Sequence, residues 1–241
     1  MKRLVVHHHL GLGDHFICNG LVNHLADTHD VVHLPCKRAY YATVSCLYSE
    51  QPKVEVFAVD DEATDVASVA RRLNAEILRV GFGRVDRERF DVSFYEQLGI
   101  PFEYRYSKFR LPSHIPQEDE VFRTLTDGHE PYCLVHREGS AGTYRLSIDS
   151  PLPIVPIDKQ RPEAPFRNLV NYRRLIERAS EIHCINSSVI HLVESIGPAA
   201  ALYYHDVRKR NFQTRLPWRT IEYRPRWVHE AAARARQVFR T

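Results

Sequence analysis

Short apolar runs alternate with helix-periodic segments along the first half of the chain. The runs are rich in β-branched and aromatic residues, and the longer segments repeat their apolar residues with a helical period. Strands are expected at residues 4–10, 30–36, 54–60 and 75–81, and helices at residues 15–29, 39–48 and 64–74. Such alternation over short connections predicts a parallel sheet covered by helices on both faces.

The pattern breaks at residues 90–120, where the sequence indicates a helix, an extended piece and an exposed, proline-bearing connection. Beyond it the alternation restarts, which predicts two consecutive α/β lobes, residues 1–112 and residues 113–241, with the linker near Pro112 to Gln117. In the second lobe, strands are expected at residues 132–138, 152–158, 181–186 and, as the last strand, 199–206, with helices at residues 167–179, 187–197 and 227–239. The C-terminal helix is expected to pack back across the lobes, although its basic residues also suit a membrane surface.

Composition narrows the class of protein. The 241 residues include 33 basic and 30 acidic ones, a net charge of +3 that disfavours nucleic acid as a partner. The basic run at residues 205–215 is either a solvated loop or an anion contact near a site. Five cysteines without paired spacing suit reduced thiols. With no signal sequence or apolar stretch long enough to span a membrane, a cytoplasmic protein is expected.

The turn "GLGD" after the first strand allows several kinds of site. A dinucleotide fingerprint needs a third glycine, but Phe16 stands there, and the second strand does not end in an acidic residue. A metal site at His7, His8 and His9 is disfavoured because consecutive strand residues alternate between faces. Asp14 remains, at the carboxyl edge where open α/β sheets bind ligands. It either caps the next helix or, beside His15 and His9, accepts a proton from a hydroxyl group.

The second half offers groups suited to a phosphate. Ser187 and Ser188 open a helix directly after a strand, and His191 follows one turn later. Free N–H groups at a helix N-terminus attract anions, although a serine there is also an ordinary N-cap. A second loop after a strand carries Arg137, Ser140, Thr143 and Arg145.

Three stretches carry a family resemblance: "GLGDHFICNGLVNHLA", "LVHREGSAGTYR" and "EIHCINSSVIHLVESIGPAAALYY". Together they resemble the motifs of heptosyltransferase-like glycosyltransferases, of which this chain would be a compact, divergent member. The family pattern differs at Asn186, Ser188 and Val193, where it has Asp, Gly and Ala. The resemblance implies an α/β protein of the GT-B type, with two Rossmann-like lobes whose parallel sheets face each other across a cleft.

The resemblance also implies a reaction, the transfer of a sugar from a nucleotide-diphosphate sugar to a saccharide or glycolipid hydroxyl. Asp14, with His15 beside it, would act as the catalytic base. The donor would be bound by Gly13, Arg137, Ser140, Thr143, Arg145, Ser187, Ser188 and His191. Neither a metal nor another cofactor is expected, because basic side chains and a helix N-terminus can neutralise the diphosphate and no Asp-x-Asp motif occurs. A base at Asp14 favours inversion.

Two other functions stay open at this point. A nucleotide-sugar epimerase or hydrolase would turn over the donor without an acceptor, and a non-catalytic module would bind a nucleotide-sugar without chemistry. The sequence leaves the nucleobase, the sugar and the acceptor undetermined, as well as the oligomeric state and any peripheral contact with a membrane.

Overall fold

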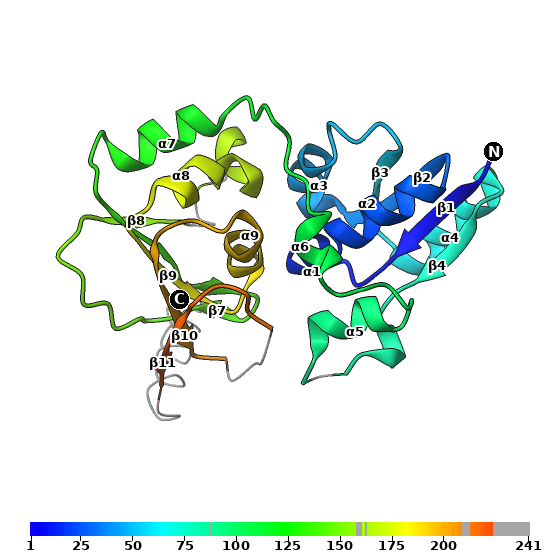
Figure 1. Ribbon diagram of the computed structural model, residues 1–241. Coiled ribbons are helices and arrows are strands. Elements are labelled where there is room, and N and C mark those ends of the chain that lie inside the picture. Colours follow the sequence, from blue (N-terminus) through cyan, green and yellow to red (C-terminus); the bar gives the residue numbers. More distant parts are fainter. Residues whose placement is uncertain (87, 158–160, 162, 209–212, 224–241) are drawn as a thin grey trace, which may run out of the picture. The chain divides into compact units, whose positions relative to one another are not determined.

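The computed structural model describes residues 1–86, 88–157, 161, 163–208 and 213–223 (Figure 1). These residues form two compact units, which are considered separately. The first unit comprises Met1–Ile115 and Gln213, and the second comprises the other described residues from Pro116 onward.

The first unit is built on a four-stranded sheet in the order β3-β2-β1-β4. All neighbouring strands run parallel: β1 (Arg3–His7), β2 (Val31–Lys37), β3 (Val54–Val59) and β4 (Glu76–Arg79). The helices between and after them are α1 (Leu12–Ile17), α2 (Asn19–Thr28), α3 (Tyr41–Leu47), α4 (Glu62–Leu73), α5 (Phe90–Glu96) and α6 (Tyr104–Ser107). The strand–helix alternation predicted from the sequence is therefore confirmed for this unit.

The apolar runs become strands because they are buried on both faces. Leu4, Val5 and Val6 of β1 are at most 3% exposed, as a central parallel strand requires. On one face Val5 packs in a cluster with residues of α4, among them Val66 and Ala70. Helix α4 begins where Asp61 accepts a hydrogen bond from Thr64 N–H, and it ends at Asn74 in a left-handed conformation.

The second unit contains a five-stranded parallel sheet in the order β11-β10-β9-β5-β8. Its strands are β5 (Cys133–His136), β8 (Ile154–Pro156), β9 (Glu181–Ile185), β10 (Ala201–Asp206) and β11 (Arg219–Glu222). A small antiparallel hairpin, β6 (Glu138–Gly139) with β7 (Gly142–Thr143), follows β5. The helices are α7 (Glu118–Thr126), α8 (Arg173–Arg178) and α9 (Ser188–Ile196).

Two elements of the second unit differ from the sequence-based expectation. Residues 118–126 form helix α7 instead of an exposed connection, and Arg173 at the start of α8 binds Glu118 there through a charge-assisted pair. The strand at residues 201–206 is not the last one, because β11 pairs with it in parallel. The helix expected at residues 227–239 lies outside the described residues. In the described part of the chain, no helix combines the length and apolar character needed to cross a membrane.

Candidate functional site

Asp14 lies on a tight turn at the carboxyl edge of the first sheet. After β1 the chain bends and enters α1, whose N-cap is Gly11 and whose third residue is Asp14. The Asp14 side chain folds back, so that its Oδ2 accepts a hydrogen bond from Gly11 N–H at 3.2 Å. A Cβ at Gly11 would lie 2.6 Å from Oδ2, so a side chain there would displace the carboxyl group. The first glycine of "GLGD" thus makes room for the carboxylate.

Burial changes the acid–base behaviour of this group. It raises the pKa of the Asp14 carboxyl to about 7, because the surroundings solvate its charge poorly. The Gly11 N–H and the positive charge of Lys37 act in the opposite direction, although both effects are smaller. A carboxyl group with a pKa near 7 accepts and releases protons at neutral pH, as a general base must.

The histidines of this region divide into buried and half-buried ones. His8 and His15 are fully buried, and their rings meet edge to face at 4.6 Å between centroids. Burial lowers the pKa of His8 to about 4 and the pKa of His15 well below its usual value, so both rings are neutral. His15 therefore packs in the core of the first unit, whereas the Asp14 carboxyl is only partly buried.

His9 is half-buried and held in one tautomer. Its Nε2 accepts a hydrogen bond from Phe82 N–H at 2.8 Å, so the proton of the neutral ring is on Nδ1. The ring also contacts the aromatic rings of Phe82, Phe90 and Phe94. His9 therefore forms part of an aromatic patch at the same edge of the sheet as Asp14.

In the second unit, helix α9 begins at the carboxyl end of β9. Ser187 is its N-cap, and the Ser187 Oγ accepts a hydrogen bond from Val189 N–H at 3.3 Å. Ser188 is the first helical residue, and His191 is 7% exposed one turn later. The hydroxyl of Ser187 thus acts as a cap, as its sequence context allows, while the remaining N–H groups of the first turn give this end its positive character.

The loop after β5 is joined to this turn by an arginine that the sequence analysis did not select. Arg208 follows β10 and donates from Nη1 to the Asn186 carbonyl oxygen at 2.8 Å and from Nη2 to Ser140 Oγ at 3.2 Å. It thereby joins the turn of the β6–β7 hairpin and the residue after β9 to the segment after β10. The only sequence signal was the basic run at residues 205–215, for which an anion contact was one of two interpretations.

Among the predicted donor-binding residues of this loop, only Ser140 is tied to the turn by a hydrogen bond between described residues. Arg137, Thr143 and Arg145 are exposed, and Tyr144 N–H binds the Arg137 carbonyl oxygen at 2.9 Å across the hairpin. The structure therefore brings Ser140, Ser187 and Arg208 toward one sheet edge and leaves the arginines of the hairpin facing solvent.

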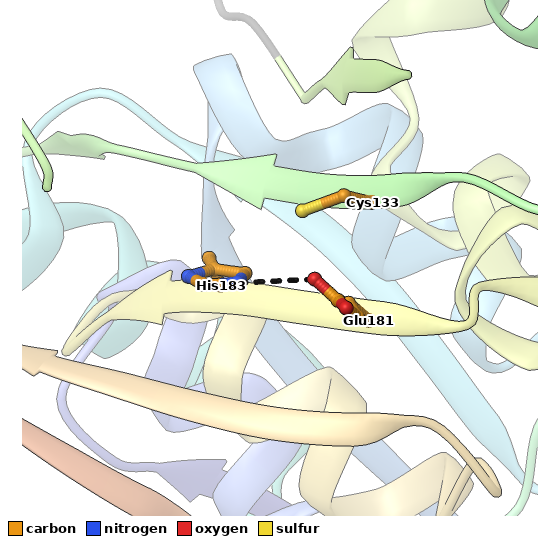
Figure 2. Close-up of side chains that lie close together, drawn as sticks. All are labelled: Cys133, Glu181 and His183. Carbon is orange, nitrogen blue, oxygen red and sulfur yellow. Dashed lines mark ion pairs between the residues drawn. The ribbon is translucent and has the colours of Figure 1, made fainter. Parts of the chain in front are cut away.

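One group of described side chains has the donor types and spacing of a metal centre: Cys133, Glu181 and His183 (Figure 2). Cys133 and Glu181 are the first residues of β5 and β9. The group therefore lies toward the amino edge of the sheet, whereas Ser187 and Arg208 follow the carboxyl ends of strands.

The two parallel-sheet units give the chain a fold that it shares with a solved glycosyl transferase structure. The chain is similar to the crystal structure of the glycosyl transferase family 9 from Veillonella parvula DSM 2008, with a TM-score of 0.57 and 12% identity over 98% of this chain and 96% of that chain. It is also similar to E. coli ADP-heptose lps heptosyltransferase II, with a TM-score of 0.49 and 12% identity over 93% and 91% of the two chains. No protein-family model and no curated sequence matches the chain.

Proposed function

We propose that the protein is a glycosyltransferase that moves a sugar from a nucleotide-diphosphate sugar to a hydroxyl group of a glycan or glycolipid acceptor. The observation that carries the proposal is the Asp14 carboxyl, which burial holds at a pKa of about 7 on the turn between β1 and α1. The fold shared with glycosyl transferase family 9 gives this group a context in which a base is needed.

On the acceptor side, the Asp14 carboxylate takes the proton of the attacking hydroxyl. As the oxygen forms its bond to the anomeric carbon, the bond from that carbon to the diphosphate oxygen breaks, and the nucleoside diphosphate leaves with the electron pair. A single displacement of this kind inverts the anomeric configuration. The aromatic rings around His9 supply an apolar wall against which a sugar ring can pack.

On the donor side, the leaving diphosphate develops the largest charge of the reaction, so fixed donors there lower the barrier most. We assign this role to Arg208, Ser140 and the first turn of α9, and propose that Arg137 and Arg145 join when the donor binds. Gly13, Thr143, Ser188 and His191 complete the set of proposed donor contacts. In this mechanism, cationic side chains and backbone N–H groups neutralise the diphosphate without a divalent ion.

The first experiment identifies the donor and then removes the base. A thermal-shift screen against UDP-, GDP-, ADP-, CMP- and dTDP-linked sugars gives the nucleotide, and transfer from that donor is then measured for the Asp14→Asn variant. The amide keeps the size of the carboxyl group but cannot accept a proton, so transfer should fall by about 100- to 10,000-fold. Donor affinity should stay within about twofold, because all the proposed donor contacts except Gly13 lie on the second unit and the substitution leaves Gly13 unchanged.

The control is Asp30→Asn, the same exchange at an exposed residue whose carboxylate binds Lys2 N–H at the amino edge of the sheet. It should transfer at the wild-type rate. In the wild type, transfer should rise with pH through about 7, because only the ionised carboxylate accepts a proton. Transfer by Asp14→Asn near the wild-type rate would reduce Asp14 to a helix-capping residue. Donor cleavage without an acceptor would instead indicate a hydrolase, and binding without turnover a binding module.

The donor site is tested by Arg208→Ala. The substitution removes a cation and breaks the bridge between Ser140 and Asn186, so nucleotide affinity should fall by about 10- to 100-fold, since charge-assisted hydrogen bonds contribute about 1.5–3 kcal/mol each. Arg174→Ala is the matched control, because Arg174 pairs with Asp119 on α7 and contacts no proposed donor residue. Isothermal titration with the nucleotide found in the screen measures both. Equal affinity in the two variants would remove Arg208 from the site.

A further inference from the structure

We propose that Cys133, Glu181 and His183 of the second unit form a site for Zn²⁺. The three side chains come from two adjacent strands, since Cys133 pairs with Glu181 in the β5–β9 register and His183 follows two residues later on the same face of β9. Figure 2 shows them grouped together on these two strands. No part of the proposed glycosyl transfer uses them.

The spacing of the donor atoms is close to that of a tetrahedral zinc centre. The Cys133 sulfur, a Glu181 oxygen and a His183 nitrogen lie within 4.8 Å of one another. Bond lengths of about 2.0–2.3 Å to zinc place neighbouring tetrahedral ligands about 3.4–3.7 Å apart. His183 Nε2 and Glu181 Oε2 are already 3.7 Å apart, so small side-chain rotations would complete the geometry.

Two of these atoms lack the partners that buried polar atoms normally have. His183 Nε2 and Glu181 Oε2 lie 3.7 Å apart, at ion-pair distance, as the dashed line in Figure 2 marks, but both are buried and neither makes a hydrogen bond. The His183 side chain is only 2% exposed, so water does not replace the missing partner readily. A metal ion between the two atoms would satisfy both.

The outer contacts of His183 suit a metal ligand. Its Nδ1 lies 2.8 Å from His205 Nε2, and His205 Nδ1 lies 2.7 Å from the hydroxyl of Tyr223. The Tyr223 oxygen also accepts a hydrogen bond from Ser147 N–H at 2.8 Å. When each histidine donates from Nδ1 along this chain, the lone pair of His183 Nε2 points at the proposed metal. Metal-bound histidines are usually oriented by such a second hydrogen bond.

The third ligand is a thiol that must lose its proton. Cys133 is fully buried, and burial raises its pKa to about 11, while a hydrogen bond from Ser150 acts in the opposite direction. The metal–sulfur bond would form as the thiol proton passes to solvent. Sulfur, imidazole and carboxylate together favour Zn²⁺ over Mg²⁺ or Ca²⁺, which prefer oxygen ligands alone. Three protein ligands leave a fourth position for water.

A metal here would stabilise a weakly structured part of the second unit. Residues 144–153, between β7 and β8, form no helix or strand, yet Ser147 and Ser150 of this segment contact Tyr223 and Cys133. The proposed ion would therefore link β5 to β9. Through the contacts of Ser147 and Ser150 it would also hold residues 144–153 against the sheet. We infer a structural role for the ion, separate from the donor site.

The test is metal binding by the full chain after treatment with a chelator. Zn²⁺ should bind with one-to-one stoichiometry and raise the melting temperature. Co²⁺ should give the near-ultraviolet absorption band of a thiolate ligand, which Zn²⁺ then abolishes by displacement. Glu181→Gln, which keeps the side-chain volume, should weaken Zn²⁺ by at least about tenfold.

The matched pair for the thiol is Cys133→Ser and Cys184→Ser. Both exchange a buried thiol for a hydroxyl on neighbouring strands, but Cys184 follows His183 directly and so lies on the other face of β9. The Co²⁺ band should vanish in the first variant and persist in the second, with circular dichroism reporting whether each is folded. A wild type without stoichiometric Zn²⁺ binding, or a band that survives Cys133→Ser, would overturn the proposal. If Cys133→Ser does not fold, the proposal would be overturned by a Glu181→Gln variant that binds Zn²⁺ with unchanged affinity.

Discussion

At Asp14, the same burial that raises the carboxyl pKa also destabilises the folded chain once the group is ionised. Its pKa is about 7 in the folded state against 3.8 for the ordinary group, so between these values the folded state binds more protons than the unfolded state. The free energy of unfolding must therefore fall as the pH rises through this interval. We infer that the site holds a base at neutral pH at the expense of stability, as many active sites do.

This gives a prediction for Asp14→Asn that is separate from its loss of transfer. The variant should be more stable than the wild type at about pH 8, where the buried carboxylate is charged, and the difference should shrink as the pH falls toward 3.8, below which the carboxyl is mostly protonated in both states. Urea unfolding at several pH values measures it. A variant that is less stable at about pH 8 would mean that the hydrogen bond from Gly11 outweighs the cost of burial.

The stability of the wild type and of Asp14→Asn must be compared, because buried histidines change the free energy of unfolding with pH in the opposite direction. Burial lowers the pKa values of His8 and His205 to about 4. As the pH falls below 6.5, the unfolded state takes up protons at these histidines before the folded state does, so the free energy of unfolding falls. These histidines are present in both the wild type and Asp14→Asn. Their contributions cancel in the difference between the two proteins.

The position of Asp14 could be predicted from the sequence, whereas its neighbours could not. A strand followed by "GLGD" fixes the carboxyl group at a sheet edge, because strand, turn and helix are all local features. Whether His15 faces outward depends on the rotation of α1 against the sheet, which tertiary packing decides. Arg208 was missed for a related reason, since its partners Ser140 and Asn186 are 68 and 22 residues away.

Helices α2 and α6 pack closely at Gly20, the glycine of the first unit that leaves the least room for a side chain. A Cβ at Gly20 of α2 would lie 1.9 Å from the Tyr104 carbonyl oxygen of α6, and backbone atoms cannot move aside as a flexible side chain can. The contact is reinforced nearby, where Asn19 Oδ1 accepts a hydrogen bond from Arg110 N–H at 2.8 Å. The glycine is therefore required by packing and not by backbone conformation.

Gly20→Ala should consequently lower the free energy of unfolding by about 3 kcal/mol, since it forces the two helices apart. Gly83→Ala is the matched control, because a Cβ there meets no heavy atom within 4 Å, and its effect should stay within about 0.5 kcal/mol. Urea denaturation of both variants measures the two changes. Similar stability for the two would mean that α6 can shift without cost.

The elements that the sequence predicted well are those whose own residues are apolar enough to indicate that they are buried. The runs that became β1, β9 and β10 are apolar enough to be recognised alone. Helix α7 was missed because Glu118, Asp119 and Glu120 suggest solvent, and the arginines of α8 that pair with two of them lie more than 50 residues away. Strand β11 is short and polar, and only its pairing with β10 defines it.

For the molecule as a whole, the two units divide the proposed chemistry. The proposed base belongs to the first unit and the proposed donor contacts, apart from Gly13, belong to the second, each at the carboxyl edge of its own sheet. Variants of one unit should therefore alter the chemical step or donor affinity separately, as Asp14→Asn and Arg208→Ala are designed to show. The proposed zinc site lies toward the amino edge of the second sheet, where its loss can be detected without a nucleotide.

The five-stranded order of the second sheet also has a consequence for how separate copies of the chain behave. A bare strand edge invites pairing with other chains, and natural sheets protect their edges with proline, charge or short strands. Among the residues that the structure describes, the edge strands are β8, which follows Pro153 and contains Pro156, and β11, which is four residues long and carries Arg219 and Glu222. Without β11, the edge would be the more apolar β10, with Leu202 and Tyr204.

Residues Thr220 and Ile221 should therefore act as a safeguard against aggregation. In a parallel pair, alternate N–H groups point to one neighbour, so one of Thr220→Pro and Ile221→Pro must detach β11 from β10. That variant should scatter light increasingly with protein concentration, whereas the corresponding lysine variants keep the pairing and should remain clear. Clear solutions of both proline variants would mean that β10 does not need a covering strand. Otherwise, the four residues of β11, none of which is among the proposed substrate contacts, set the concentration at which the protein stays monodisperse.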